Sequence, residues 1–535
     1  MKGHTSPNCP LAQYGQYMCY VCRRITDHRG PDCPQKQYKN NSNQNGNSQK
    51  NRGRGGGKIR GGKLFTGRGR GKPYSKTDNN TQKATIRTVL AVINKLDLEA
   101  VQLDVKTAFL NGQLQDEVYM EIPDGLEIDI EPGKRKVCRL LKTIYGLKTS
   151  PKIWNQKFTQ EVNKLGLERD INEPCLFTWR KDGKVVILVL YVDDIILASN
   201  HIEKLNEVKT SLCKTFEMKV LGEPNKYLGM EIVRNRRERV MTLTQVEYTK
   251  KVLERFKMSE SKAQSTPMVT RQVKTRNTKQ KQIEDEPKPS NAPYGEAIGS
   301  LMYLATVTRP DIAFAVIYLS RKQVNPSEED WSDVKRVLRY LQGTIDTGLS
   351  FRAYTDELSS FTDSSFRDNS DSISTSGYVI KLFGDTIAWR SHKQSYVSLS
   401  TCQAEYLAMS ESAQELISLD KAIRDMLGKT KLPARIWCDN KSALDCTQMD
   451  GSHKLKNFDD PLSSIKEYLE ERERTGVKKH MADTHGDYKK SCAMDGKLIL
   501  GWVNTNENEA DIMTKPLPTQ THEYLRDKIL NKIVT

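Results

Sequence analysis

Hydrophobic positions divide the chain into four regions. Residues 1–83 are polar and show no sustained periodicity, so we expect no regular structure there apart from one small metal site. Residues 84–258 alternate apolar helical stretches with short β-rich runs, which predicts a first α/β body. A polar, lysine-rich stretch at 259–292 is typical of a linker, and residues 293–535 predict a second α/β body.

Three patterns in the first body bear on its chemistry. Asp104 ends an apolar strand, and the aromatic Phe109 follows five residues later. Apolar runs on both sides of Asp193 and Asp194 predict a β-hairpin with paired carboxylates at its turn. Residues 226–232 predict a short strand interrupted by a glycine.

Paired carboxylates on rigid strands suit Mg²⁺, which prefers oxygen ligands. Two such ions would activate a 3′-hydroxyl and stabilise a leaving pyrophosphate, the requirement of nucleotidyl transfer. An isolated Asp-Asp pair is more often an ordinary polar turn. The strands on either side of Asp193 and Asp194 make that interpretation less favoured but leave it open.

Four spaced acids mark the second body. One ends a strand at 358–362, one lies in the first turns of a helix, one follows a strand at 434–438, and one opens the last helical segment: Asp363, Glu405, Asp439 and Asp511. Ser400 and Gln403 predict a capping box for the helix. Acids so placed can converge on two Mg²⁺ ions, although each alone is more often a surface acid or a cap, and Asp356 competes for the first position.

The net charge of +17 is concentrated at the N-terminal end, where residues 1–83 hold 17 Lys and Arg against 3 Asp and Glu. A basic arm indicates a polyanionic partner, most simply nucleic acid. The RGG-like tract at 52–71 favours RNA binding over the alternative of a flexible linker, since arginine stacks on bases and pairs with phosphates.

Four potential metal ligands within residues 19–33 have the spacing C-x2-C-x5-H-x4-C: Cys19, Cys22, His28 and Cys33. Three thiolates and an imidazole suit one tetrahedral Zn²⁺ ion. The other cysteines, of 11 in all, are scattered, which argues for a reducing compartment. No apolar run approaches the ~20 residues of a membrane helix. We therefore expect an intracellular protein, cytoplasmic (particle-associated) or nuclear, that is neither secreted nor membrane-bound.

Tyr191-Val-Asp-Asp and the blocks DVKTAFLNG (104–112), YGLKTSPKIW (145–154) and GSLMYLATVTRPDIAFAV (299–316) resemble the reverse transcriptase of copia-type retrotransposons. STSGY (374–378), AEY (404–406) and ADIMTKPLP (510–518) are similar to the same family's ribonuclease H. The resemblance is to a truncated Pol polyprotein with a Gag-like zinc knuckle.

This resemblance implies an α/β (α+β) fold, with a palm and thumb at 84–258 and a connection and ribonuclease H domain at 293–535. It implies that Asp104, Asp193 and Asp194 hold two Mg²⁺ ions and that Asp363, Glu405, Asp439 and Asp511 hold two more. Phe109 would be the gate against the ribose 2′-hydroxyl, with Tyr191 and Lys148 also at the substrate. The implied partners are RNA, RNA/DNA hybrid and deoxynucleoside triphosphates.

Two departures from the family pattern matter. Nothing in residues 1–83 matches the fingers segment that precedes the palm in the family, so polymerisation is expected to be weak unless a second copy or another chain supplies fingers. Residues 478–497 match nothing in the family and predict an insertion. Two functions stay open: an RNA-directed DNA polymerase with ribonuclease H, and a catalytically dead protein that binds nucleic acid through its knuckle and RGG arm.

Overall fold

The computed structural model describes residues 79–123, 125, 136–270, 292–369, 371–428, 434–448 and 498–532, and the backbone of two short N-terminal strands. Residues 1–75 and 76–535 form two separate units. In the first, β1 (Tyr17–Met18) pairs antiparallel with β2 (Ile25–Thr26). Several predicted features lie outside the described residues: Cys19, Cys22, His28, Cys33, the tract at 52–71 and the insertion at 478–497.

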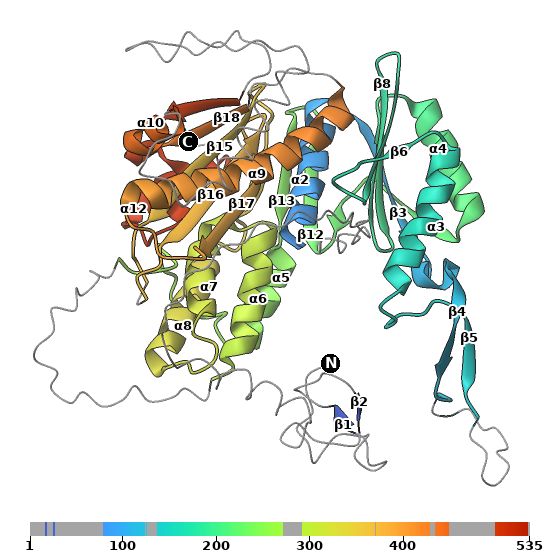
Figure 1. Cartoon of the computed structure of the whole chain (residues 1–535), viewed down its shortest axis with the longest axis horizontal. Coiled ribbons are helices and arrows are strands. Elements are labelled where there is room, and N and C mark those ends of the chain that lie inside the picture. The colour runs from blue at the N-terminus through green and yellow to red at the C-terminus, as the bar shows by residue number, and fades with distance from the viewer. Residues whose placement is uncertain are drawn as a thin grey trace, which may run out of the picture. The chain divides into compact units, whose positions relative to one another are not determined.

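A six-stranded antiparallel sheet organises the first body (Figure 1). Its order is β10-β3-β9-β8-β7-β6, and its strands are β3 (Glu99–Val105), β6 (Glu168–Arg169), β7 (Leu176–Lys181), β8 (Lys184–Tyr191), β9 (Asp194–Ser199) and β10 (Met218–Gly222). The predicted hairpin is confirmed, because β8 and β9 pair with Tyr191 opposite Asp194.

Strand β8 is a continuous apolar run because both faces of the sheet are covered. Val186, Leu188 and Leu190 pack in a cluster with α3 (Ser150–Lys164) and α4 (Ile202–Thr215), which lie side by side on one face (Figure 1). Ile187 and Val189 pack in the other cluster with α2 (Asn79–Lys95). The sheet is thus held rigidly beneath its acidic turn.

Two hairpins leave this sheet. A short 3-10 helix, η4 (Ala108–Asn111), leads into β4 (Gln113–Met120), which pairs with β5 (Cys138–Lys142). The strand predicted at 226–232 is instead a tight hairpin of β11 (Lys226–Tyr227) and β12 (Met230–Asn235). Leu228 and Gly229 both have positive φ, +46° and +72°, so the chain reverses where a break in one strand was expected.

Strand β12 continues a sheet that links the two predicted bodies. Its order is β11-β12-β13-β14, with β13 (Val240–Thr244) from the first body and β14 (Leu349–Phe351) from the second. Part of the predicted linker is also packed, since Arg336 of α8 (Glu328–Gln342) donates to the buried Thr266. Residues 271–291 of that linker lie outside the described part of the chain.

Helices of the second body precede a five-stranded mixed sheet. The helices are α6 (Tyr294–Val307), α7 (Ala313–Ser320) and α8, and the 3-10 helix η5 (Pro310–Ile312) lies between α6 and α7. The last helix of the first body is α5 (Val246–Arg255). The sheet order is β17-β16-β15-β18-β19, for β15 (Leu358–Ser365), β16 (Thr375–Leu382), β17 (Asp385–Lys393), β18 (Ala434–Cys438) and β19 (Leu498–Trp502). β15, β18 and β19 run parallel, while β16 and β17 are antiparallel to their neighbours.

The long helix α9 (Thr401–Leu427) crosses this sheet (Figure 1). The remaining elements are α10 (Lys441–Gln448), η7 (Thr505–Glu507), η8 (Glu509–Met513) and α12 (Thr519–Leu530). Ser400 caps α9 by accepting from the Gln403 N–H, as predicted, but the Gln403 amide oxygen accepts from Leu399 N–H instead of closing the capping box on Ser400.

Helix α2 joins the two bodies. Its residues from Ala84 to Asn94 are all buried, which is typical of a helix enclosed on every side. Arg87 stacks 4.0 Å from the Trp389 ring and donates to the carbonyls of Thr306, Val307 and Ile387. Burial lowers the pKa of Arg87 to about 9. In the part of the chain that the structure describes, no helix is long and apolar enough to cross a bilayer.

Candidate active sites

The first candidate site lies at one end of the six-stranded sheet. Asp104 on β3 is the direct cross-strand partner of Asp194 on β9. Asp193 occupies the β8–β9 turn, and its carbonyl accepts from the Val105 N–H at 2.8 Å. Antiparallel pairing therefore brings Asp104 to the adjacent pair Asp193 and Asp194, from which it is far in the sequence.

The turn is held in an unusual conformation. Val192 has φ +58°, a region that β-branched residues rarely adopt. Its carbonyl accepts from the indole N–H of Trp154 on α3 at 2.6 Å. Burial raises the pKa of Asp194, and the charges of Asp193 and Asp104 raise it further. The paired carboxylates are thus kept close at an electrostatic cost, as in a site that a cation would stabilise.

The residues predicted to contact the substrate differ in how deeply they are buried near this turn. Phe109 is buried in η4, and its ring lies 4.5 Å from that of Tyr145. Tyr145, which the sequence analysis did not single out, is half exposed, and burial together with Asp193 raises its pKa. Tyr191 is half-buried at the end of β8, whereas Lys148 is exposed in the loop before α3.

The second candidate site brings together the four acids of the second body. Asp363 lies inside β15, which continues to Ser365 and does not end before Asp363 as predicted. Asp439 directly follows β18, as predicted. Asp511 lies in the 3-10 helix η8 and does not open the last α-helix, because Pro516 and Pro518 separate it from α12. Ligand oxygens of these three acids lie within 4.8 Å of one another.

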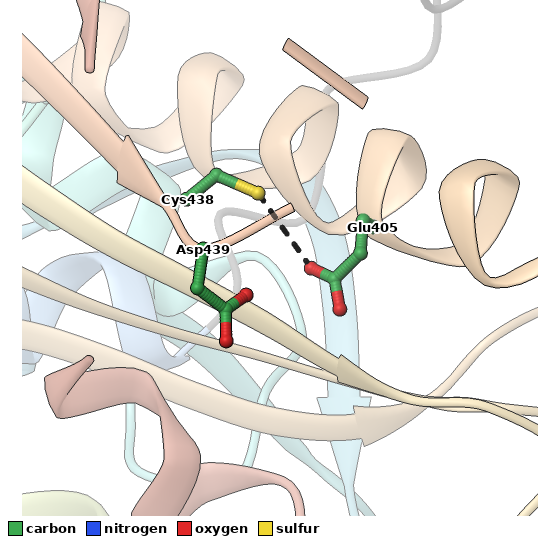
Figure 2. A group of neighbouring side chains, drawn as sticks. All are labelled: Glu405, Cys438 and Asp439. Atoms are coloured by element: carbon green, nitrogen blue, oxygen red, sulfur yellow. Dashed lines mark hydrogen bonds between the residues drawn. The ribbon is translucent and has the colours of Figure 1, made fainter. Parts of the chain in front are cut away.

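Glu405 completes the cluster from the first turns of α9 (Figure 2). One carboxylate oxygen accepts from the Ser364 N–H at 3.1 Å, and the other faces the Cys438 thiol at 3.9 Å. Burial and the nearby charges of Asp363 and Asp439 raise the pKa of Glu405 well above its usual range. Burial and then Asp363 also raise the pKa of Asp439.

Two side chains that the sequence analysis missed complete the cluster's contacts. The Thr514 hydroxyl donates to Asp363. The Lys515 ammonium lies 3.0 Å from Asp511 and 3.5 Å from Asp363. Burial alone would lower the pKa of Lys515, but these two acids raise it. The available signal was the spacing, since a lysine four residues after an acid predicts an ion pair.

Gly377 on β16 allows η8 to approach the acids. It is the cross-strand partner of Asp363, and a Cβ added there would lie 2.6 Å from the Met513 Cβ and 2.7 Å from Thr514 Cγ2. Within the STSGY block, Gly377 therefore allows the backbone of β16 to approach that of η8 closely. We also find the buried Asn508 side chain donating to the Thr362 carbonyl, which fixes the start of η8.

Gly377→Ala is expected to push η8 away from β16 and separate Thr514 from Asp363. Overpacking of this kind costs about 1–3 kcal/mol of unfolding free energy, measurable by urea denaturation. Gly299→Ala is the matched control, because its Cβ would meet nothing within 4 Å on α6 and alanine favours helix. Equal stability of the Gly377→Ala variant and the parent would show that η8 does not depend on this contact.

The side chains of the second cluster fit Mg²⁺, because they offer buried carboxylate oxygens, the ligands that this ion prefers. Lys515 neutralises only part of their negative charge, so a cation would stabilise the site. Among the described residues, both groups of side chains close enough to share one ion include Asp439: Asp363, Asp439 and Asp511, and Glu405, Cys438 and Asp439. Asp104, Asp193 and Asp194 form no such group. The second cluster is therefore the better formed of the two candidate metal sites.

The acid cluster should make stability depend on pH. Burial, with Asp363 adding to it, raises the pKa of Asp511 to about 7, above the ~3.9 of an unfolded chain. The folded protein retains a proton that the unfolded chain would release, so this group's contribution to stability falls as pH rises from about 4 to about 7. In EDTA at pH 8, Asp511→Asn is expected to stabilise the protein by on the order of 1–2 kcal/mol.

At pH 4 most of that gain should disappear, because Asp511 is then protonated in the folded state and about half protonated in the unfolded chain. Urea unfolding at the two pH values checks the prediction. Asp346 is exposed, so the Asp346→Asn variant serves as control and should show no pH-dependent gain in unfolding free energy. An Asp511→Asn variant that is less stable than the parent at pH 8 would mean that the Lys515 ion pair outweighs burial.

An antiparallel sheet with three aspartates at one end is the arrangement expected of a polymerase palm. The family model described as "Reverse transcriptase (RNA-dependent DNA polymerase)" matches residues 71–270. The retrovirus-related Pol polyprotein from transposon TNT 1-94 of Nicotiana tabacum is 36% identical over 448 residues, covering 83% of this chain and 32% of the relative. That from transposon RE2 of Arabidopsis thaliana is 32% identical, covering 86% and 29%.

A shorter relative, the putative transposon Ty5-1 protein of Saccharomyces cerevisiae, is 31% identical over 320 residues, covering 59% of this chain and 100% of the relative. The chain therefore belongs to the copia-type family of retrotransposon Pol polyproteins and carries a reverse transcriptase domain. It spans about a third of the length of the two Pol polyproteins.

Proposed function

We propose that the chain is an RNA-directed DNA polymerase with ribonuclease H activity, in which the second body cuts the RNA strand of an RNA/DNA hybrid. The convergence of Asp363, Asp439 and Asp511 carries this proposal. The parallel pairing of β15 with β18 supports the proposal, because it brings Asp363 and Asp439 to the same end of the mixed sheet, beneath α9. Two Mg²⁺ ions per active site are the cofactors that these carboxylates suit.

In the proposed nuclease, Asp363, Glu405, Asp439 and Asp511 would hold the ions, and the chemistry that bound Mg²⁺ would supply there is activation of water and stabilisation of the leaving oxygen of a phosphodiester. The protein's own groups set the geometry. Ser364 N–H orients Glu405, Thr514 orients Asp363, and the Trp502 indole N–H holds the Asp439 carbonyl at 3.1 Å. Lys515 neutralises part of the charge between Asp363 and Asp511.

In the proposed polymerase, Asp104, Asp193 and Asp194 hold the ions and deoxynucleoside triphosphates are substrates, with Phe109, Tyr191 and Lys148 at the nucleotide. We propose that this activity is the weaker one. The palm acids lack the close grouping of the second cluster, and Lys148 is exposed to solvent. Misplacement of a substrate by about 1 Å can cost a hundredfold in rate.

A second candidate function rests on the charge of residues 1–83. With 17 basic and 3 acidic residues, this arm favours binding of RNA, assisted by one Zn²⁺ ion at Cys19, Cys22, His28 and Cys33. A protein that only binds nucleic acid would keep this activity after loss of both catalytic sites.

One experiment separates these functions. The whole chain is incubated with Mg²⁺ and either a primed RNA template or a labelled RNA/DNA hybrid. The proposal predicts hybrid cleavage that persists in Asp193→Asn, and any primer extension is lost in that variant. RNA binding with neither reaction would reject the enzyme proposal and leave the binding function.

A further inference from the structure

Two cysteines on different helices face each other near the second cluster of acids. Cys402 lies in the first turn of α9, and Cys446 lies on α10. Their Sγ atoms are 3.6 Å apart, both residues are half-buried, and neither is joined in a disulfide. The two thiols are 44 positions apart in the chain, but the fold places their sulfur atoms in van der Waals contact.

We propose that Cys402 and Cys446 form a reversible disulfide when the chain meets a small-molecule disulfide such as oxidised glutathione. The thiolate of one cysteine attacks the glutathione disulfide and releases one reduced glutathione, leaving a mixed disulfide. The second thiolate attacks the protein sulfur of that mixed disulfide and releases the second glutathione. The two protein thiols together lose two protons and two electrons, and one glutathione disulfide takes them up to become two thiols.

The geometry requires little movement. A disulfide bond is ~2.05 Å long, so the sulfurs must approach by roughly 1.5 Å, within reach of side-chain rotation and a small shift of α10. α10 already packs on α9. An excess of reduced glutathione reverses both steps, so the pair stays reduced in a reducing compartment and closes as glutathione disulfide accumulates.

The bond would link the helices next to two metal-holding acids. Glu405 follows Cys402 by three residues, one turn along α9. α10 begins at Lys441, two residues after Asp439, and Asn440 caps it by accepting from the Ala443 N–H. Oxidation therefore restrains α10, and with it the loop carrying Asp439, against the helix that carries Glu405.

The full chain, equilibrated in glutathione buffers of increasing oxidation and then alkylated, is digested and analysed by mass spectrometry. We expect a peptide pair joined through Cys402 and Cys446, removed by dithiothreitol. Cys446→Ser should lose this pair and carry one glutathione on Cys402. Cys213→Ser, in the palm helix α4, should retain it. Separate glutathione adducts on Cys402 and Cys446 in the parent protein would overturn the proposal.

Thermal unfolding is a second readout that needs no catalytic activity, so it can fail independently of the proposed nuclease. Closing a loop of this length restricts the unfolded chain, and the oxidised parent is expected to melt several degrees higher than the reduced one. Cys446→Ser should show no such shift. A joined peptide pair without any thermal shift would overturn the inference that the bond restrains α10 against α9.

Discussion

Asp439→Asn is expected to reduce cleavage of an RNA/DNA hybrid by more than about a hundredfold. Removing a residue that only hydrogen-bonds to a metal ligand already lowers metal affinity or activity by about 10–100-fold. Asp439 itself belongs to both described groups of side chains that could share an ion, so its loss should have a larger effect. An amide keeps the shape of the side chain but removes the charge that would hold Mg²⁺. Cleavage rates of the purified full chain at saturating Mg²⁺ measure the effect.

Asp445→Asn is the matched control for this prediction. Asp445 is an exposed acid six residues further along, on α10, outside both metal-binding groups. The control should cleave like the parent, and both variants should unfold at similar urea concentrations. Cleavage by Asp439→Asn at the parent rate would remove Asp439 from the nuclease site.

Arg309→Ala is expected to destabilise the second body by about 3–5 kcal/mol, because it leaves Asp311 charged and buried without its partner. The guanidinium binds both Asp311 carboxylate oxygens, at 2.9 and 2.8 Å, and the pair is almost fully buried. The Tyr340 hydroxyl also donates to Asp311. This network ties η5, which leads into α7, to α8, and so gives Arg309 and Asp311 a structural role.

The Asp311 network also predicts a pH dependence. Burial alone would raise the pKa of Asp311, but Arg309 holds it at about 2. Its folded-state pKa lies below the unfolded ~3.9, so the stability it contributes is present above pH 4 and lost as pH falls toward 2. Arg309→Ala should weaken that acid-induced loss in urea unfolding experiments.

The exposed ion pair of Arg255 with Glu296 provides the control. Arg255→Ala should cost less than about 1 kcal/mol, because exposed pairs are screened by solvent. The double variant Arg309→Met with Asp311→Leu should be more stable than Arg309→Ala, since no unpaired charge remains. If Arg309→Ala costs no more than Arg255→Ala, the network does not stabilise the second body.

The elements predicted most securely from the sequence have strong local signals. The β8–β9 hairpin follows from two apolar runs around Asp193 and Asp194, and the start of α9 follows from its Ser400 cap. The turn at Leu228 and Gly229 was misinterpreted because a single glycine does not distinguish a broken strand from a reversal. The 3-10 helix at Asp511 was missed because Pro516 and Pro518, which separate it from α12, were not taken to interrupt the last helical segment.

Tertiary relationships could not be predicted from any local pattern. Nothing in the sequence around Ala84 to Asn94 indicates that α2 is enclosed by both bodies, or that β14 joins the sheet of the first body. The convergence of Asp363, Asp439 and Asp511 depends on parallel pairing of β15 with β18 and on the close approach at Gly377. Lys515 acquires its importance only through that convergence.

The acids of the second body are proposed to form a metal-dependent nuclease site. Crystals of the full chain soaked in Mn²⁺ and measured at the manganese edge would show whether they bind metal. Anomalous peaks are expected in contact with the carboxylates of Asp363, Glu405, Asp439 and Asp511, with the Lys515 ammonium displaced. A map without a peak there, with Lys515 still between Asp363 and Asp511, would rule out the metal site.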